Sequence, residues 1–488
     1  MLESPAWSFT SWLFTFIPTM DHNISPYQPP ASSEVIQEIS GRFSSPESSA
    51  AKELLGWSRL GILVLAIAGI MALLVAASRI PGIEKFSFWP LGFFQKGLVV
   101  HVIFSFILWF LAIYGALLCL FSDHRSGEKF GRFIVGMVFA ASILLAMPAF
   151  MSDSIASLNN YVPIIIDPVF YLGLGLLGAA LLSQTFRFLS QSSLFSRTLS
   201  TCKSIITIAA LLFTVALICL VIAGTFLWGD SPSEEYNENL FWGFGHILQF
   251  TNVAMLIGAW VYLANVSGLI ITPGPFKWAG AILLLASFAG PLIYGFTEAF
   301  SATQQLAYTN LQYAFALVMS VVLLSLAVSF SHLGRPYPWR NPAFLTLVLS
   351  IFVFCVGGIL GLFVDGADTR TPAHYHGVIA GINLAIMGLY YTLFLPLLGR
   401  AIKITKIIYI QIGMFAGGQT LASIGLFMAG GYGAPRKVAG ADQGLDAIGA
   451  YAGMFMNGIG ALIAIIGGVL FIWSMAIALF QKPAMSQN

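Results

Sequence analysis

The segment 371–391, TPAHYHGVIAGINLAIMGLYY, places two histidines at the start of an otherwise apolar run. A histidine in such a run is costly unless its ring serves a polar or functional role. Successive residues of an α-helix are rotated by about 100°, so His374 and His376 point to nearly opposite sides. The two rings therefore cannot easily bind one metal ion, but each can serve a different large cofactor. Haem is such a cofactor, because imidazole is a common axial ligand of its iron.

The composition of the whole chain indicates that its solvent is lipid. Of its 488 residues, 58% are hydrophobic and 9% are charged, whereas soluble domains carry about 25% charged residues. The net charge of +2 gives no reason to expect a nucleic acid partner. The four cysteines form no CxxC pair and no CxxCH motif, so we expect neither a disulfide framework nor covalently attached haem.

Apolar segments of membrane-spanning length predict an all-α integral membrane protein with about twelve transmembrane helices. Residues 1–55 are expected to form an N-terminal extension, in which one interpretation of the first segment is a place on the membrane surface. Residues 56–480 are expected to form a twelve-helix membrane domain, and 481–488 a C-terminal tail. The predicted spans are 58–78, 97–121, 133–151, 161–186, 204–228, 240–264, 278–299, 309–332, 343–364, 374–398, 407–430 and 452–479.

Basic residues in the loops predict the orientation of these spans. Loops after even-numbered spans hold twelve Lys and Arg residues, and loops after odd-numbered spans hold six. Because basic loops stay in the cytoplasm, we expect both termini to be cytoplasmic.

Four histidines are predicted to lie at one level, in the outer half of the membrane. His101 lies about one turn into the second predicted span and His246 about two turns into the sixth, while His374 and His376 open the tenth. Polar residues inside a membrane helix are functional candidates by default. The alternative is that each ring makes a separate structural hydrogen bond.

This pattern resembles subunit I of the haem–copper oxidase superfamily, over about residues 55–480. The resemblance implies that His101 and His376 clamp a low-spin haem and that His374 is the proximal ligand of a high-spin haem. It implies that His246 binds the second metal, which is copper in the oxidases and non-haem iron in the nitric oxide reductases.

The chain departs from the family at the second metal. Two adjacent histidines are expected at the outer end of span 7, where the sequence reads TEAF (297–300). Thr297 and Glu298 would replace both, and Phe250 stands where some oxidases have a tyrosine. Copper is therefore not expected. His246 and Glu298, with water or Gln249, would suit non-haem iron better than copper; the alternatives are that Glu298 carries protons or lies in water and that no second metal binds.

Two further charged groups are less specific. Arg370, which precedes His374, would pair with haem propionates or form a loop salt bridge with Asp365 or Asp368. Asp167 is either a proton group or a carboxylate that stabilises a helix N-terminus.

Three functions are compatible with these residues. The first is a respiratory-type oxidoreductase subunit that reduces O2 or nitric oxide at the His374 haem, assisted by Glu298 and His246. The second is a haem-bearing electron-transfer subunit without a second metal. A transporter without haem is the third, but it does not explain why four histidines lie at one level of the membrane.

Because the chain has no cytochrome c domain or dinuclear copper motif, electrons would come from a partner subunit such as a c-type cytochrome, or from quinol. The resemblance thus implies a multisubunit complex in a prokaryotic inner membrane.

The orientation is testable by cysteine labelling in intact cells. We expect Ser126→Cys and Ile402→Cys to resist a membrane-impermeant thiol reagent added from the periplasmic side, because both positions follow even-numbered spans. A cysteine in the acidic loop 229–239 should label and serves as the control. Ready labelling at positions 126 and 402 would reverse the topology.

Overall fold

The computed structural model describes residues 26–31, 33–43, 45–77, 93–122, 128–191, 200–364, 366, 368–438 and 443–481. Within this part of the chain, twelve helices are long and apolar enough to cross a membrane, which confirms the prediction of a twelve-span all-α membrane protein. Their bounds are Ser49–Val75, Phe94–Phe121, Lys129–Phe150, Pro168–Gln191, Thr201–Phe226, Glu234–Val266, Pro273–Phe296, Ala302–Ser331, Pro342–Gly361, Arg370–Leu397, Lys406–Gly431 and Ile448–Phe480.

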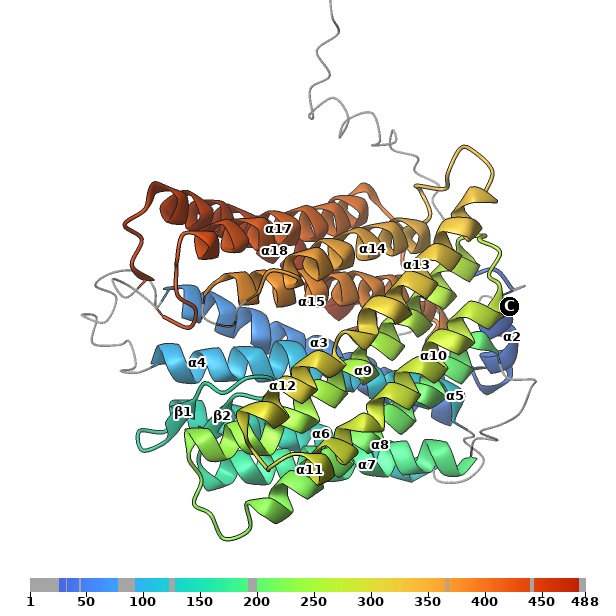
Figure 1. Cartoon of the computed structure of the whole chain (residues 1–488). Helices are drawn as coiled ribbons and strands as arrows, with labels where there is room; N and C mark the ends of the chain where they lie inside the picture. Colours follow the sequence, from blue (N-terminus) through green and yellow to red (C-terminus); the bar gives the residue numbers. More distant parts are fainter. Residues whose placement is uncertain are drawn as a thin grey trace, which may run out of the picture.

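The helices lie side by side, with α17 and α18 at one edge of the bundle and α7 and α8 toward the other (Figure 1). Several spans are built from consecutive elements, including two π-helical turns, η3 and η5. The elements are α2 Glu34–Ile39, η1 Ser40–Arg42, α3 Ser49–Ala77, α4 Phe93–Val102, η3 Ile103–Leu108, α5 Trp109–Phe121, α6 Glu128–Ala146, η4 Met147–Phe150, β1 Ile155–Ser157, β2 Ile164–Ile166, α7 Pro168–Gln191, α8 Thr201–Phe226, α9 Glu234–Val266, α10 Pro273–Ser287, α11 Ala289–Phe296, α12 Ala302–Leu311, α13 Ala314–Ser331, α14 Pro342–Gly361, α15 Arg370–Leu389, η5 Tyr390–Phe394, α16 Leu395–Leu397, α17 Lys406–Gly431 and α18 Ile448–Phe480.

The predicted start of the fourth span was wrong. Helix α7 begins at Pro168, and the residues before it form strand β2, which pairs antiparallel with β1. The sequence IIIDP (164–168) explains the difference, since β-branched residues favour a strand and proline favours the first helical position. The Asp167 side chain accepts a hydrogen bond from the Val169 amide (2.8 Å) at the start of α7, so of the two predicted roles it has the structural one. We call the end of the bundle that carries β1 and β2 the hairpin end.

Helix α9 also begins earlier than predicted, at Glu234 instead of residue 240. Ser233 caps it, because its side chain accepts a hydrogen bond from the Tyr236 amide at 3.0 Å. Acidic residues that the sequence placed in a loop thus belong to the first two turns of the helix. His246 consequently lies twelve residues, about three turns, from the helix start instead of two.

Helices α14 and α15 approach each other through glycine. A Cβ at residue 357 would lie 2.4 Å from the backbone nitrogen of Val378, and one at residue 377 would lie 2.6 Å from Cα of Gly357. A Cβ at residue 381 would likewise meet the backbone of Phe354 at 2.8 Å. Small residues at such contacts are typical of membrane helices, where packing replaces the hydrophobic driving force.

The same device joins α17 to α18 at the edge of the bundle. Cβ atoms at residues 418, 425 and 460 would each lie 2.4 Å from a backbone nitrogen of the facing helix. These helices are therefore held at backbone contact over several turns.

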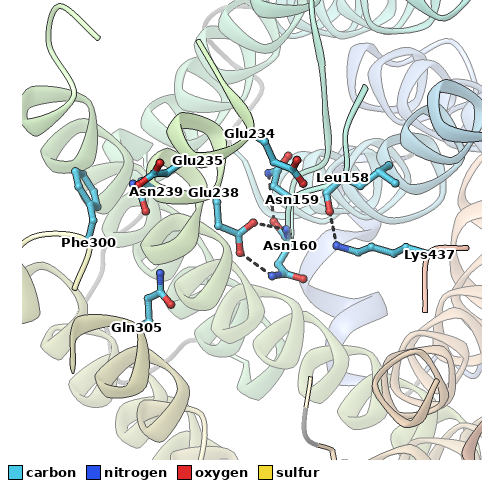
Figure 2. Close-up of a pocket in the computed structure, with 10 residues that line it drawn as sticks. All are labelled: Leu158, Asn159, Asn160, Glu234, Glu235, Glu238, Asn239, Phe300, Gln305 and Lys437. Atoms are coloured by element: carbon cyan, nitrogen blue, oxygen red, sulfur yellow. Dashed lines mark hydrogen bonds between the residues drawn. The ribbon is translucent and has the colours of Figure 1, made fainter. Parts of the chain in front are cut away.

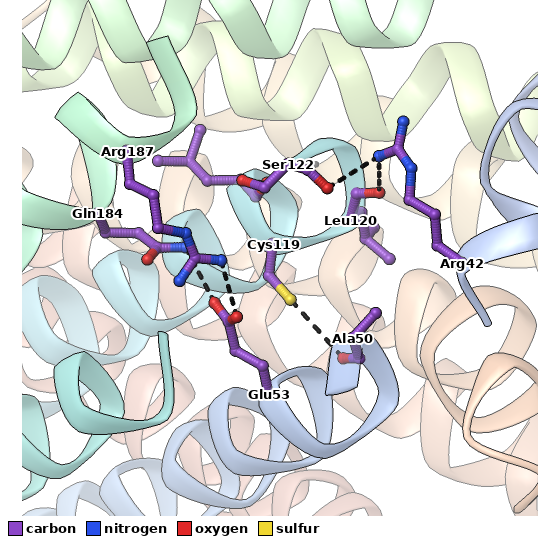
Figure 3. A network of polar contacts seen from close by, with 9 residues as sticks. Arg42, Ala50, Glu53, Cys119, Leu120, Ser122, Gln184 and Arg187 are labelled. Atoms are coloured by element: carbon purple, nitrogen blue, oxygen red, sulfur yellow. Dashed lines mark hydrogen bonds and ion pairs between the residues drawn. The ribbon is translucent and has the colours of Figure 1, made fainter. Parts of the chain in front are cut away.

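A buried ion pair joins α3 to α7 at the end opposite the hairpin, next to α6 (Figure 3). The Arg187 guanidinium donates to the Glu53 carboxylate at 2.7 Å, and the Gln184 amide donates to the other oxygen at 3.2 Å. Glu53 is fully buried and Arg187 is 7% exposed. A Cβ at residue 131 of α6 would lie 2.1 Å from both charged groups, so glycine is required there. The predicted span 161–186 ends just before Arg187, whereas this residue belongs to α7.

The glycine contact between α14 and α15 can be tested with neighbouring residues. We expect Gly357→Ala to lower the free energy of unfolding by about 1–3 kcal/mol, because the methyl group overlaps the facing backbone. Gly358→Ala is the matched control, since a Cβ there meets nothing within 4 Å. Equal midpoints of thermal unfolding in detergent for the two variants would contradict the packing argument.

The Glu53–Arg187 pair makes a separate prediction. Glu53→Gln or Arg187→Met should each destabilise the protein by roughly 3–5 kcal/mol, because each leaves a buried charge without its partner. The double variant should recover part of that loss, since neither charge remains. Additive losses in the thermal unfolding midpoint would show that the two residues act independently.

Candidate functional site

His374 is positioned by the glycine contact between α14 and α15. Its Nδ1 lies 2.8 Å from the carbonyl oxygen of Gly357, one turn before Gly361 on α14. A Cβ at residue 361 would lie 2.4 Å from the same nitrogen, so glycine makes room for the ring. The half-buried His374 ring therefore lies against α14 on one side of α15.

His376 lies on a different side of α15, which faces the second span. Residues 376, 383 and 390 are seven apart and share one face of this span. On that face Asn383 accepts a hydrogen bond from the Trp109 indole at 2.8 Å, and Tyr390 stacks on the same indole with centroids 5.8 Å apart. Trp109 begins α5, in the same span as His101. Helix geometry thus places His376 on the side of the tenth span that carries Asn383 and Tyr390, whereas the His374 ring lies against α14.

His101 is anchored in the same manner as His374. Its Nδ1 lies 2.9 Å from the carbonyl oxygen of Ala68 on α3. The π-helical turn Ile103–Leu108 begins two residues later, and such turns are frequent at functional sites.

The bonding of these rings fits an axial ligand. A metal-binding histidine usually donates one ring N–H to a carbonyl, which fixes the tautomer and leaves the other nitrogen for the metal. His101 and His374 each bond a carbonyl through Nδ1. Within the described residues, Nε2 of neither ring has a hydrogen-bond partner.

His246 is bonded differently from these two. It is 1% exposed, and its Nδ1 lies 2.8 Å from the carbonyl oxygen of Trp242. Its Nε2 lies 3.0 Å from the hydroxyl of Tyr161, so both ring nitrogens are engaged. The Tyr161 and His246 ring centroids are 4.4 Å apart.

Tyr161 is the site residue that the sequence analysis missed, because it was assigned to the start of a helix. It lies in the loop between β1 and β2 with φ of 60°, which is uncommon for a residue other than glycine. A Cβ at residue 245 would lie 2.4 Å from Cβ of Tyr161, so Gly245 provides the space for it. Burial and the nearby Glu238 carboxylate raise the pKa of Tyr161, so the phenol is neutral and can donate to Nε2.

Charged groups at the hairpin end hold this loop in place (Figure 2). The Glu238 carboxylate accepts hydrogen bonds from the backbone nitrogen and the side-chain amide of Asn160, at 2.7 and 2.6 Å. Arg436 donates to the Asn160 side-chain oxygen at 3.2 Å, and Lys437 donates to the carbonyl of Leu158. We call Glu238, Asn160, Arg436 and Lys437 the loop clamp. It borders a cavity of about 520 Å³ that Glu234 and Glu235 also line.

The contacts described for the His246 ring do not include Glu298. Glu298 is exposed in the loop between α11 and α12 and lines a second cavity, of about 670 Å³, with Asp230 and Glu235. Its neighbour Thr297 donates to the carbonyl of Ile293 and accepts from Gln304. Among the described residues, no group of three or more His, Cys, Asp or Glu side chains could hold a metal ion. The donor set at His246 thus does not fit a second metal.

The other predicted residues have structural partners. Gln249 donates to the carbonyl of Gly245, and the buried Phe250 packs on Phe315 with centroids 4.5 Å apart. Arg370 pairs with Asp368 (2.7 Å), the predicted loop salt bridge, and has further contacts. Asp365 lies outside the described residues.

Comparisons with known proteins agree with this fold. No family model matches the chain. An uncharacterized protein of Aquifex aeolicus is 32% identical over 363 residues, which span 72% of this chain and 86% of that protein. Cytochrome c oxidase subunit 1 of Thermus thermophilus is 26% identical over 167 residues, which span 31% of this chain and 30% of that protein.

The cryo-EM structure of a heme-copper terminal oxidase dimer superposes on the chain with a TM-score of 0.68 and 17% identity. The match covers 91% of this chain and 86% of that one, so the fold is shared along almost the whole bundle. The chain therefore belongs to the family of the Aquifex protein and is a divergent protein of the haem–copper oxidase subunit I-like fold.

Proposed function

We propose that the chain is the haem-bearing subunit of a respiratory-type membrane oxidoreductase. In this proposal His101 and His376 hold a low-spin haem between the second and tenth spans, and His374 holds a second, high-spin haem. When bound, haem iron would supply one-electron chemistry, and the protein would supply its ligands and environment.

The observation that carries the proposal is the shared bonding of His101 and His374. Each ring gives Nδ1 to a backbone carbonyl, of Ala68 and of Gly357, and keeps Nε2 without a described protein partner. A histidine that served only to make one structural hydrogen bond would gain nothing by leaving its second ring nitrogen without a hydrogen-bond partner. The Trp109–Asn383 bond supports the pairing of His101 with His376, because it joins their two spans.

Gas reduction is the second part of the proposal and depends on the histidine count. The chain has seven histidines. His332 lies at the end of α13, and His22 and His124 lie outside the described residues. Both ring nitrogens of His246 are engaged, so among the described histidines His374 is the candidate ligand of the second haem. The other face of that haem would be open to O2 or nitric oxide. The alternative is electron transfer to a partner enzyme. Among the described residues no donor set fits a second metal, and this favours electron transfer over a complete oxidase centre.

Arg370 and Glu298 have supporting roles in the proposal. Arg370 begins α15 one turn before His374, so a propionate could share its guanidinium with Asp368. Glu298, exposed beside an acidic cavity, would act as a proton group instead of a metal ligand. Electrons would come from a c-type cytochrome subunit or quinol in a multisubunit complex of a prokaryotic inner membrane.

Ligand variants test the proposal through haem spectra of the purified protein. We expect His101→Ala and His376→Ala each to abolish the low-spin signal, because either change removes one of its two axial ligands. His374→Ala should abolish the high-spin signal and its response to carbon monoxide, while the low-spin signal remains.

His332→Ala is the control, since this exposed histidine lies at the end of α13. Its spectra should equal those of the unmodified protein. A low-spin signal that survives in both His101→Ala and His376→Ala would refute the assignment. Turnover of O2 or nitric oxide with a reduced donor would separate gas reduction from electron transfer.

A further inference from the structure

We propose that Tyr161 takes the place of a second metal. Its hydroxyl hydrogen-bonds to Nε2 of His246, and the loop clamp holds the tyrosine in this position. The position beside His246 would then hold neither copper nor non-haem iron. This inference goes beyond the proposed function and does not depend on haem being bound.

The first support is the geometry of the His246 ring. With Nδ1–H donated to Trp242 and Nε2 accepting from Tyr161, the imidazole has one fixed neutral tautomer and no nitrogen left for a metal. Coordination through Nε2 would require the phenol to leave. The vacated hydroxyl would then be a buried polar group without a partner, which is costly.

The second support is that the loop is built to keep Tyr161 where it is. Its backbone adopts φ of 60°, which a tyrosine does not adopt without compensation. The compensation comes from Glu238, whose two oxygens hold Asn160, the preceding residue, at 2.7 and 2.6 Å. Charge-assisted bonds of this kind are about twice as strong as neutral ones.

The third support is the helix surface beneath the loop. Gly245 lacks the Cβ that would displace Tyr161, and it directly precedes His246. The Trp242 ring meets the Tyr161 ring edge-on, with centroids 6.0 Å apart. One helical turn of α9 thus provides three contacts for the Tyr161 side chain: the hydrogen-bond acceptor of His246, the space left by Gly245 and the Trp242 ring.

The fourth support is the lack of other ligands among the described residues. Copper and iron sites need several donors in one place, and Glu298 contributes none to the described contacts of His246. No group of three or more His, Cys, Asp or Glu side chains among the described residues could complete such a site.

Metal analysis tests the inference on the purified full-length protein. After incubation with Cu²⁺ or with Fe²⁺ and gel filtration, we expect equal copper and equal non-haem iron in the unmodified protein and in His246→Gln. Non-haem iron is total iron minus haem iron, so the same samples report haem content separately. One copper or one non-haem iron per chain that is lost in His246→Gln would overturn the inference, whatever the haem content.

A double-mutant cycle tests the hydrogen bond itself. We expect Tyr161→Phe and His246→Gln each to lower the thermal unfolding midpoint, and the double variant to fall by clearly less than the sum, because both changes remove one interaction. The matched control is Tyr308→Phe, since this buried tyrosine lies 5.6 Å from the His246 ring but donates to the carbonyl of Gly290. Its coupling with His246→Gln should be clearly smaller than that of Tyr161→Phe, because no described hydrogen bond joins the Tyr308 hydroxyl to the His246 ring. Additive effects for Tyr161→Phe would contradict the inference.

Hydrogen exchange tests the loop clamp without relying on a damaged core. Glu238→Gln should increase amide exchange in residues 157–162, because the carboxylate that holds Asn160 is lost. Glu235→Gln, which changes a carboxylate of the same cavity, should leave that exchange unchanged. Equal exchange in both variants would show that the clamp does not hold Tyr161.

Discussion

The contact between the backbones of α14 and α15 is the constraint on which the candidate site depends. Gly357 and Gly377 let the two helices approach until a Cβ on either would overlap the other backbone. At this separation the His374 ring reaches the carbonyl of Gly357, and Gly361 leaves space for the ring. The same glycines thus set the helix spacing, the ring orientation and the direction of Nε2. A larger residue at any of these positions would move the histidine as well as the helix.

Polar contacts complete the arrangement that the glycines begin. Lipid is as apolar as leucine, so apolar contact alone does not select one neighbour for a membrane helix. The Trp109–Asn383 hydrogen bond selects the second span as the neighbour of α15, and the Glu53–Arg187 pair joins α3 to α7. A buried ion pair is weak support for net stability, but one missing partner is strongly destabilising, which favours a single arrangement of the helices.

Features that depend on long apolar runs could be predicted from the sequence. Features that depend on a few local residues, such as the β1–β2 hairpin, were missed. The twelve spans, and the placement of His374 and His376 on different sides of one helix, follow from periodicity and helix geometry. For Asp167 the sequence left a proton group and a carboxylate at a helix N-terminus as alternatives. The hairpin was missed because three isoleucines before Asp167 and Pro168 extend an apolar run, although together they indicate a strand that ends where a helix begins. That error concealed Tyr161. The identity of residue 161 alone could not predict the hydrogen bond between the Tyr161 hydroxyl and His246. That contact depends on the pairing of β1 with β2 and on Glu238 of α9.

The use of the two ring nitrogens distinguishes the histidines of this bundle. A buried imidazole without partners is costly, so each nitrogen must be paired within the protein or kept for a ligand. In His101 and His374 one nitrogen is given to a carbonyl and the other has no described protein partner. In His246 both are used, and the second is closed by a tyrosine held in a strained conformation. Because strain of this kind persists only where its surroundings maintain it, the loop clamp and Gly245 indicate that the closure is part of the design of the site. In our proposal, a chain with the oxidase fold thus retains histidines for haem while the Tyr161 side chain occupies the position of the second metal.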